Sequence, residues 1–233
     1  MHSIVWELSK FNISMKSKYE NIYALEDDIN FLSGSSNFSE MDTLEWFLIS
    51  NKNKKISFLS LGVPSFFFHI SLNLLPDFNR IDTLPLMECI DKFMFDVSVQ
   101  DKAFFDFKLN QLIVISDNSS FYYKVYIIDD LYFLLNNEYK YQGFILYKAT
   151  THIINSGNKR NESIFNEALG KMLTLCNSEV YEQMDEKNSN YFMFIQNLED
   201  FCIKNTSLDE RLSEIIEFTK MVKLTFYDID SIR

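Results

Sequence analysis

Glycine and proline are scarce in this chain: only 5 of its 233 residues are glycine and 3 are proline. Loops that cradle phosphate groups need glycines, because the backbone must approach the phosphate closely and adopt positive φ angles. Neither GxGxxG nor GxxxxGK followed by Ser or Thr occurs in the sequence. The sequence therefore argues against a Rossmann dinucleotide site and against a P-loop nucleotide site.

Cysteine is also rare, and the three cysteines are far apart: Cys89, Cys176 and Cys202. Their odd number and the absence of a CxxC pair argue against a disulfide framework and against a zinc site. Cys176 and Cys202 fall on the apolar faces of predicted helices, which argues against a catalytic thiol. We expect all three to be small buried side chains of a protein in a reducing compartment.

The three histidines have no spacing that would let two of them share a metal ion, and HExxH is absent. They are His2, His69 and His152. No serine stands in a GxSxG nucleophile elbow. We expect the histidines to be structural, and we expect neither a cofactor nor a bound metal.

Basic residues are outnumbered: the chain has 22 Lys and Arg against 33 Asp and Glu, which gives a net charge of −11. General nucleic-acid binding depends on Lys and Arg that neutralise phosphates, so an acidic chain is a poor general binder of nucleic acid. The same charge disfavours binding to anionic membrane surfaces. A basic protein is the partner that this charge favours.

Long hydrophobic runs are missing as well. The most apolar runs, 66–75 and 125–135, are too short or too interrupted by polar residues to span a membrane. The first residues, MHSIVWELSKFN, do not combine a basic start with a long apolar stretch, so we expect no signal peptide. These features indicate a cytoplasmic protein.

Aromatic residues, by contrast, are abundant, with 23 Phe, 12 Tyr and 2 Trp. Together with a hydrophobic fraction of 47%, they provide for a substantial core that needs no disulfide or metal. No linker clearly divides the chain, so we expect one domain over 1–233, with a strand-rich part at 1–154 and a helical part at 155–233. The surplus of aromatic side chains also allows a homodimer.

Hydrophobic alternation predicts strands in the first part of the chain. The segments with this pattern are 2–8, 55–61, 66–74, 94–100, 103–115, 121–128, 131–136 and 142–148. Helical spacing instead predicts a helix at 19–32. It also predicts a short helix that Ser39 caps and that carries Leu48, and another that Thr83 caps.

After the polar loop 155–161, the apolar period changes from two residues to about 3.6. Three amphipathic helices are expected there, at 164–180, 191–202 and 207–222, and a last strand at 224–229. Strands that cluster first and helices that cluster afterwards indicate an α+β protein. We expect a largely antiparallel strand-rich region at about 55–148 and three helices within about 161–223.

The last predicted helix opens with the pattern of a capping box, in which Ser207 and Glu210 satisfy each other's backbone N–H groups. Its inward face is expected to consist of Leu208, Leu212, Ile215, Thr219 and Val222.

One motif suggests an enzyme. Asp77 follows a proline, and Asp106 and Lys108 stand in the tripeptide Asp-Phe-Lys on a predicted strand. Two carboxylates and a lysine on adjacent strands can hold Mg²⁺ and stabilise the charge that develops on a phosphoryl group. In that form the stretch 76–108 resembles the PD-(D/E)xK nuclease pattern. The resemblance implies a metal-dependent nuclease or phosphodiesterase centred on these three residues.

Acidic residues concentrate near the end of the chain. Residues 161–233 contain 14 acidic and 7 basic residues, a net charge of −7, whereas residues 1–160 have a net charge of −4. Two sets recur on successive helical turns: Glu179, Glu182 and Glu186, and Glu210, Glu214 and Glu217. Like charges on adjacent turns repel, and a basic partner would offset this cost.

We therefore expect a noncatalytic acidic protein that binds and inhibits a basic protein partner through these six glutamates. An immunity protein, an antitoxin or a phage-encoded inhibitor would have these properties. The alternative is the metal-dependent nuclease or phosphodiesterase. Geometry separates the two hypotheses, because a nuclease needs Asp77, Asp106 and Lys108 around one gap of Mg²⁺ size, whereas an inhibitor needs exposed carboxylates.

Overall fold

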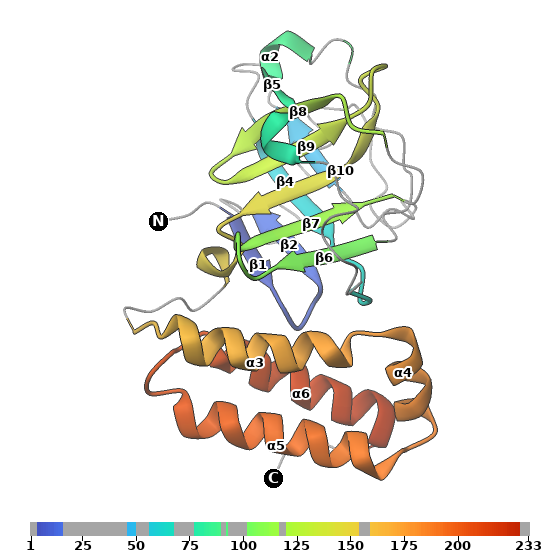
Figure 1. Cartoon of the computed structure of the whole chain (residues 1–233), viewed down its shortest axis with the longest axis vertical. Helices are drawn as coiled ribbons and strands as arrows, with labels where there is room; N and C mark the ends of the chain where they lie inside the picture. The colour runs from blue at the N-terminus through green and yellow to red at the C-terminus, as the bar shows by residue number, and fades with distance from the viewer. Residues whose placement is uncertain are drawn as a thin grey trace, which may run out of the picture.

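Strands come first and helices last in the computed structural model of the chain (Figure 1). The structure describes residues 4–15, 46–49, 56–67, 77–89, 92, 102–116, 120–153 and 159–228. Its strands lie between Ile4 and Tyr147, and the helices that follow lie between Glu162 and Tyr227. This order confirms the α+β class, with antiparallel sheets ahead of a helical layer.

The larger sheet has, among the described residues, six strands in the order β5-β8-β9-β10-β7-β6. Their bounds are β5 Asp82–Pro85, β6 Lys102–Asp106, β7 Gln111–Ile115, β8 Tyr123–Ile128, β9 Leu131–Leu135 and β10 Tyr141–Tyr147. All neighbours are antiparallel except β5 and β8. The single strand predicted at 103–115 is wrong, because the chain reverses at 107–110 and β6 pairs with β7.

The smaller sheet contains, in the part of the chain that is described, four antiparallel strands in the order β1-β2-β4-β3. Their bounds are β1 Ile4–Glu7, β2 Asn12–Met15, β3 Trp46–Ile49 and β4 Ile56–Gly62. Leu48 was expected in a short helix, but it lies in β3 and pairs with Phe58 of β4. Backbone hydrogen bonds to β4 outweigh the helical preference that the local spacing of apolar residues suggested. The sequence of one segment does not reveal which strand it pairs with.

Two further expectations concern the middle of the chain. Thr83 does not cap a helix, since it lies in β5 and pairs with Lys124 of β8. The short helix α2 (Leu86–Cys89) begins after that strand. The predicted helix at 19–32, the strand at 94–100 and most of the strand at 66–74 lie outside the described residues, as do His2 and His69.

Four helices follow residue 160 in the described chain: α3 (Glu162–Leu175), α4 (Ser178–Asp185), α5 (Ser189–Asn205) and α6 (Leu212–Tyr227). Three were predicted, with the first continuing to Val180. That helix instead stops at Leu175, and Asn177 starts α4 by accepting a hydrogen bond from the N–H of Glu179 at 2.9 Å. Asn is favoured at such N-cap positions. The predicted strand at 224–229 is also wrong, because α6 continues to Tyr227.

The predicted capping box of Ser207 and Glu210 is wrong as well. Residues 206–208 form a turn after α5, and α6 begins only at Leu212. Leu208, expected to face inward, lies in this turn and is 49% exposed. The rest of the expected inward face is buried: Leu212, Ile215, Thr219 and Val222.

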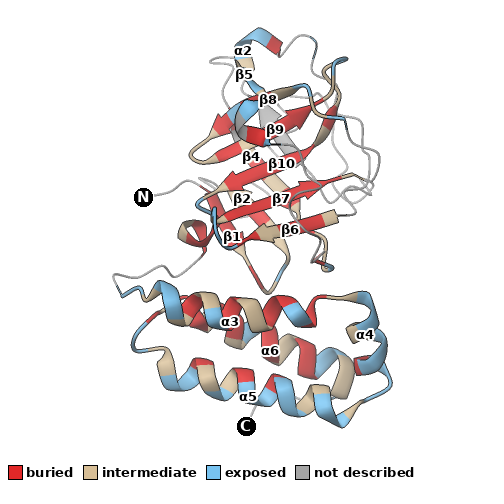
Figure 2. Ribbon diagram, viewed as in Figure 1, coloured by how far each residue is buried: buried red, intermediate tan, exposed pale blue. Residues whose placement is uncertain are grey.

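The larger sheet separates two hydrophobic cores. Successive residues of a strand point to opposite faces of the sheet. In β7, accordingly, Leu112 and Val114 belong to the large cluster, whereas Ile113 and Ile115 belong to a smaller one on the other face. Every residue of β7 is therefore buried, as the colours of Figure 2 show for this part of the sheet.

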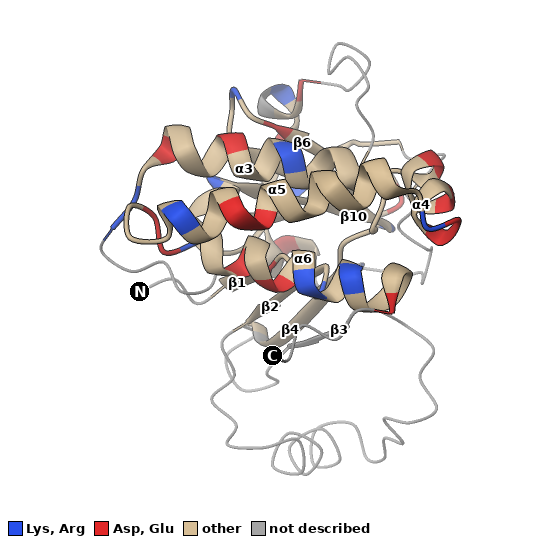
Figure 3. Cartoon of the chain, turned by 90° about the horizontal axis from the view of Figure 1, so that it is seen from below, with Lys and Arg blue, Asp and Glu red and all other residues tan. Residues whose placement is uncertain are grey.

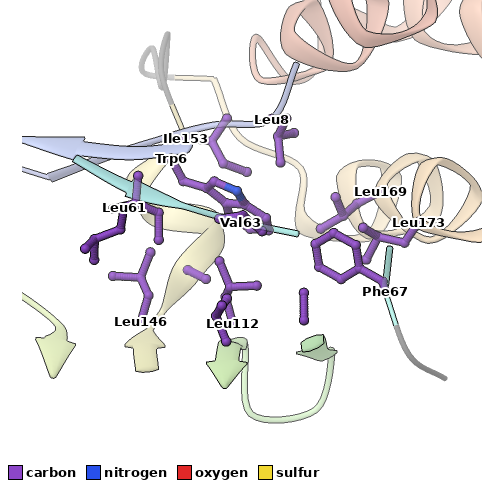
Figure 4. Packing of buried hydrophobic residues seen from close by; sticks show 14 of the residues in the cluster. Trp6, Leu8, Leu61, Val63, Phe67, Leu112, Leu146, Ile153, Leu169 and Leu173 are labelled. Carbon is purple, nitrogen blue, oxygen red and sulfur yellow. The ribbon is translucent and has the colours of Figure 1, made fainter. Parts of the chain in front are cut away.

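The large core joins both sheets to the helices. Figure 4 shows Trp6 of β1 above Leu146 of β10, with Leu169 and Leu173 of α3 approaching from the side. The ring of Trp6 stacks on that of Phe105, with 5.7 Å between centroids. Burying these large side chains supplies the main driving force for docking the helical layer.

A buried arginine side chain, Arg211, fixes where the helices dock. The side chains of Arg211 and Asp209 are fully buried, and the Arg211 guanidinium donates to the Asp209 carboxylate at 2.6 and 3.0 Å. Nη1 of Arg211 also donates to the backbone oxygen of Thr150 at 3.2 Å, in the turn η4 (Ala149–His152) that follows β10. The guanidinium lies 4.1 Å from the ring centre of Phe165 in α3. One side chain thus holds η4, α3 and the start of α6 together.

Asp209, rather than Ser207, orders the turn ahead of α6. Its carboxylate accepts the backbone N–H of Asn161 at 2.8 Å and that of Arg211 at 3.0 Å. Burial alone would raise the pKa of Asp209, but the bonds from Arg211 and Asn161 outweigh it, and the pKa lies below its usual value. The carboxylate therefore remains ionised and orders the turn ahead of α6.

Replacing Arg211 with Leu should destabilise the protein by about 3–5 kcal/mol, because the buried Asp209 carboxylate would lose its cation. Replacing the exposed Ser207 with Ala should change the free energy of unfolding by less than about 0.5 kcal/mol. Urea unfolding of both variants at pH 7 measures the difference. An Arg211→Leu variant as stable as the parent, or a loss of about 1 kcal/mol at Ser207, would contradict this assignment.

Candidate functional site

The acidic helix α4 carries the first of the two predicted glutamate sets. Glu179 and Glu182 lie on α4, Glu186 lies directly after it, and all three are exposed. Figure 3 shows these acidic residues gathered at one end of the helical layer. None of the three forms an ion pair with another side chain in the described part of the chain. Their carboxylates are therefore presented to solvent.

The second glutamate set does not form a surface stripe. Glu210 is half-buried in the turn before α6, and Glu214 is buried. Glu217 is exposed, and its carboxylate accepts a hydrogen bond from Lys220 at 2.8 Å. Only Glu217 of this set is exposed, so the six predicted residues do not share one face.

Glu214 points toward the strand-rich part of the chain. Burial raises the pKa of its carboxyl, and the negative charges of Glu7 and Glu217 raise it further, against a smaller lowering effect of Lys10. Glu7 itself accepts a hydrogen bond from Lys10 at 2.6 Å, beside the turn between β1 and β2. The docking of α6 against this turn thus turns a predicted surface charge into a buried one.

The three residues of the nuclease hypothesis have separate local roles. Asp77 is paired with Arg80 at 3.1 Å, next to the turn η3 (Phe78–Arg80). Asp106 ends β6 and accepts the backbone N–H groups of Lys108 at 2.8 Å and Leu109 at 3.0 Å, so its carboxylate orders the hairpin turn. Lys108 lies in that turn rather than on a strand. Among the described residues, no three His, Cys, Asp or Glu side chains are arranged to hold a metal ion.

Lys124 of β8 is a buried cation that the sequence reading did not single out. Its ammonium donates to the backbone oxygen of Phe78 at 3.1 Å and to the hydroxyl of Tyr147 at 3.3 Å, with the ring of Tyr132 at 5.3 Å. Burial lowers the pKa of Lys124, and the charge of Asp77 acts in the opposite direction. These contacts tie η3 to the sheet, which is a structural role.

His152 is buried and links two distant segments. One ring nitrogen lies 3.1 Å from the carboxylate of Asp130, and the other lies 3.4 Å from the backbone oxygen of Ile4. Burial alone would raise the pKa of Asp130, but bonds from Lys148 and His152 outweigh it and lower the pKa. His152 therefore fastens β1 to the turn between β8 and β9, the structural role expected for it.

The three cysteines lie in the core, as the sequence predicted. Cys89, Cys176 and Cys202 are free and buried. Burial raises the pKa of each thiol, to about 12 for Cys202. Because the thiolate is the nucleophilic form, these thiols are not reactive near neutral pH.

A shallow apolar groove runs along the outer face of α3. It is lined by Phe107 of the β6–β7 turn, by Phe194 of α5 and by five residues of α3, namely Asn166, Glu167, Gly170, Lys171 and Thr174. Lys171 and Glu167 form an ion pair at 2.7 Å. A β-carbon added to Gly170 would lie 3.7 Å from the tip of the Phe107 ring, which is ordinary van der Waals contact. The groove was not foreseen, because its walls come from segments far apart in the sequence.

Comparison with protein-family models, with curated proteins and with solved structures found no match to this chain. Among the described residues, none of the helices has the length and apolar character that crossing a membrane requires.

Replacing Glu214 with Gln should raise the free energy of unfolding at pH 7, because Gln keeps the shape of the side chain and removes a buried charge. The pKa of Glu214 is higher in the folded state than in the unfolded state, where it is near 4.5. The charged Glu214 carboxylate therefore destabilises the fold fully above the folded-state pKa, and this destabilisation disappears as the pH falls toward 4.5. The gain in stability should shrink over the same range.

Urea unfolding of Glu214→Gln between pH 7 and pH 4.5 measures this gain. Glu217→Gln is the matched control, since it removes a carboxylate one turn away that is exposed and paired with Lys220. The control should change the stability little at any pH in this range. A Glu214→Gln variant that is less stable than the parent at pH 7 would refute the argument.

Proposed function

We propose that this chain is a noncatalytic binding protein that occupies a basic protein partner through the acidic surface of α4. Proteins of this kind include immunity proteins, antitoxins and phage-encoded inhibitors. The observation that carries the proposal is the exposure of Glu179, Glu182 and Glu186 on one short helix, without ion pairs among the described residues. The net charge of −11 favours the same kind of partner.

The carboxylates of α4 stand on neighbouring turns of the helix. Like charges three or four residues apart on a helix cost a few tenths of a kcal/mol per pair, so the arrangement of α4 does not stabilise the helix itself. A surface rich in Lys or Arg would offset this cost. Complementary charges also raise association rates by about 10- to 1000-fold at low salt, an effect that screening removes over a Debye length of about 8 Å.

The basic partner contacts α4 rather than α6 in this proposal. Glu214 is buried against the strand-rich part, and Glu217 already has Lys220 as its cation. A partner that approaches α6 would therefore meet fewer open carboxylates than one that approaches α4. The acidic surface named here consists of Glu179, Glu182 and Glu186.

The test is a pull-down from the native host, followed by association-rate measurements with the purified captured protein at low and high salt. The variant Glu179→Lys/Glu182→Lys should slow association about tenfold at low salt and flatten the salt dependence, with an unchanged melting temperature. Glu138→Lys is the control, because Glu138 lies in the turn between β9 and β10 with its own cation, Lys140, at 3.8 Å.

Two outcomes would contradict the proposal. One is an association rate that the double substitution leaves at the parent value. The other is a captured protein whose binding surface has no excess of Lys and Arg. A rate that falls equally in the Glu138→Lys control would show that net charge alone, rather than α4, steers the encounter.

A further inference from the structure

An aromatic cluster lies beside the acidic helix α4. The ring of Tyr181 on α4 contacts that of Phe66, with 5.1 Å between centroids, and that of Phe226 on α6, with 5.2 Å. Phe66 is 38% exposed, whereas Tyr181 and Phe226 are half-buried. In the described part of the chain, no Lys or Arg lies over any of these three rings. The cluster therefore presents aromatic surface, chiefly that of Phe66, to a partner.

The exposed ring of Phe66 is held in place from two sides. The next residue, Phe67, is buried in the large core, and its backbone N–H donates to the backbone oxygen of Cys176 at 2.8 Å, where α3 ends. Tyr181 contacts the Phe66 ring itself. A side chain that is already ordered loses little conformational freedom when a partner binds. Aromatic side chains of this kind are enriched in protein–protein interfaces.

The period of the helix places carboxylates of α4 on the same side as Tyr181. At 3.6 residues per turn, Asp185 stands about 40° from Tyr181 around the helix axis, and Glu182 stands about 100° away in the same direction. The buried Met184 lies about 60° away in the opposite direction. Glu182 and Asp185 are exposed, and neither forms an ion pair among the described residues. Two exposed carboxylates thus border the aromatic cluster.

An aromatic ring beside carboxylates suits a guanidinium group. The guanidinium is planar and weakly hydrated, so it stacks on an aromatic ring while its N–H groups pair with a carboxylate. The ammonium of lysine is compact and strongly hydrated, so it gains less from the ring. A second copy of this chain would bring its own acidic α4 and a net charge of −11, so like charges oppose it.

We infer that an arginine side chain anchors the basic partner on this aromatic cluster. The inference rests on the proposed function and names the chemical group that α4 recognises. The guanidinium lies against the ring of Phe66 and donates to the carboxylates of Glu182 and Asp185. Glu179 and Glu186, farther around the helix from the cluster, attract other cations of the partner. The ring then distinguishes arginine from lysine, whereas the carboxylates respond to positive charge alone.

The test uses two defined probes and the full chain. The probes are fluorescein-labelled peptides of about 12 residues, in which Gly alternates with Arg in one and with Lys in the other, so that both carry the same charge. Fluorescence anisotropy at low salt measures both affinities. The Arg peptide should bind about fivefold more tightly than the Lys peptide, because only the guanidinium stacks well on the ring.

Substitutions separate the ring from the carboxylates. Phe66→Leu keeps an apolar side chain but removes the ring, so the two affinities should come within about twofold of each other. Phe66→Met is a second variant without a ring. Phe194→Leu is the matched control, since it removes a ring of α5 that is 36% exposed, and it should keep the preference for Arg. Glu182→Gln/Asp185→Asn should weaken binding of both peptides about tenfold. Thermal unfolding of each variant confirms that it is folded.

The outcomes distinguish this inference from the proposed function. If the carboxylate variant weakens binding of both peptides but the Phe66 variants keep the preference for Arg, the proposed function is supported and the arginine anchor is wrong. If the carboxylate variant binds both peptides like the parent, the inference and the proposed function both fail. Equal affinities of the two peptides for the parent, or a preference that Phe194→Leu also abolishes, would overturn the inference.

Discussion

The arrangement of helices against sheets depends on the fully buried Arg211 guanidinium. Removing a charge from water is costly, and the pair with Asp209 repays this cost only when each donor has a well-placed acceptor. Arg211 meets that condition through Asp209 and through the backbone oxygen of Thr150. Because Thr150 follows β10 and Arg211 precedes α6, the bond from Arg211 to the backbone oxygen of Thr150 forms only when the two parts of the chain are docked. This bond therefore specifies one position for the helical layer, while the apolar core supplies most of the driving force.

This docking position gives α3 two different faces. Leu169 and Leu173 enter the large core with Trp6, as Figure 4 shows, while Gly170 and Thr174 remain at the outer surface. The β6–β7 hairpin then brings Phe107 over Gly170. A core and a groove thus arise from one helix, because residues four apart, such as Leu169 and Leu173 or Gly170 and Thr174, share a face, whereas neighbours in the sequence point in different directions.

Docking also decides which acidic residues remain available to a partner. Glu214 and Glu182 belong to similar patterns in the sequence, with further glutamates on neighbouring turns. α6 packs against the turn between β1 and β2, so Glu214 is buried beside Glu7, whereas Glu182 on α4 remains exposed. Desolvation raises the pKa of the buried Glu214 carboxyl. A local charge pattern therefore identifies acidic residues that could face a partner, and tertiary packing decides which of them are exposed.

The sequence by itself determined the fold class, the change from strands to helices near residue 160, the buried cysteines and most of the inward face of α6. These features depend on hydrophobic periodicity, which is a local property of the chain. The tertiary structure decided the strand at Leu48, the hairpin between β6 and β7, the burial of Glu214 and the bond from Asn161 to the buried Asp209 ahead of α6. It also assembled the groove from Phe107, Gly170 and Phe194. Each of these depends on a partner distant in sequence, and the free energy of such a contact is not encoded in the local pattern of either segment.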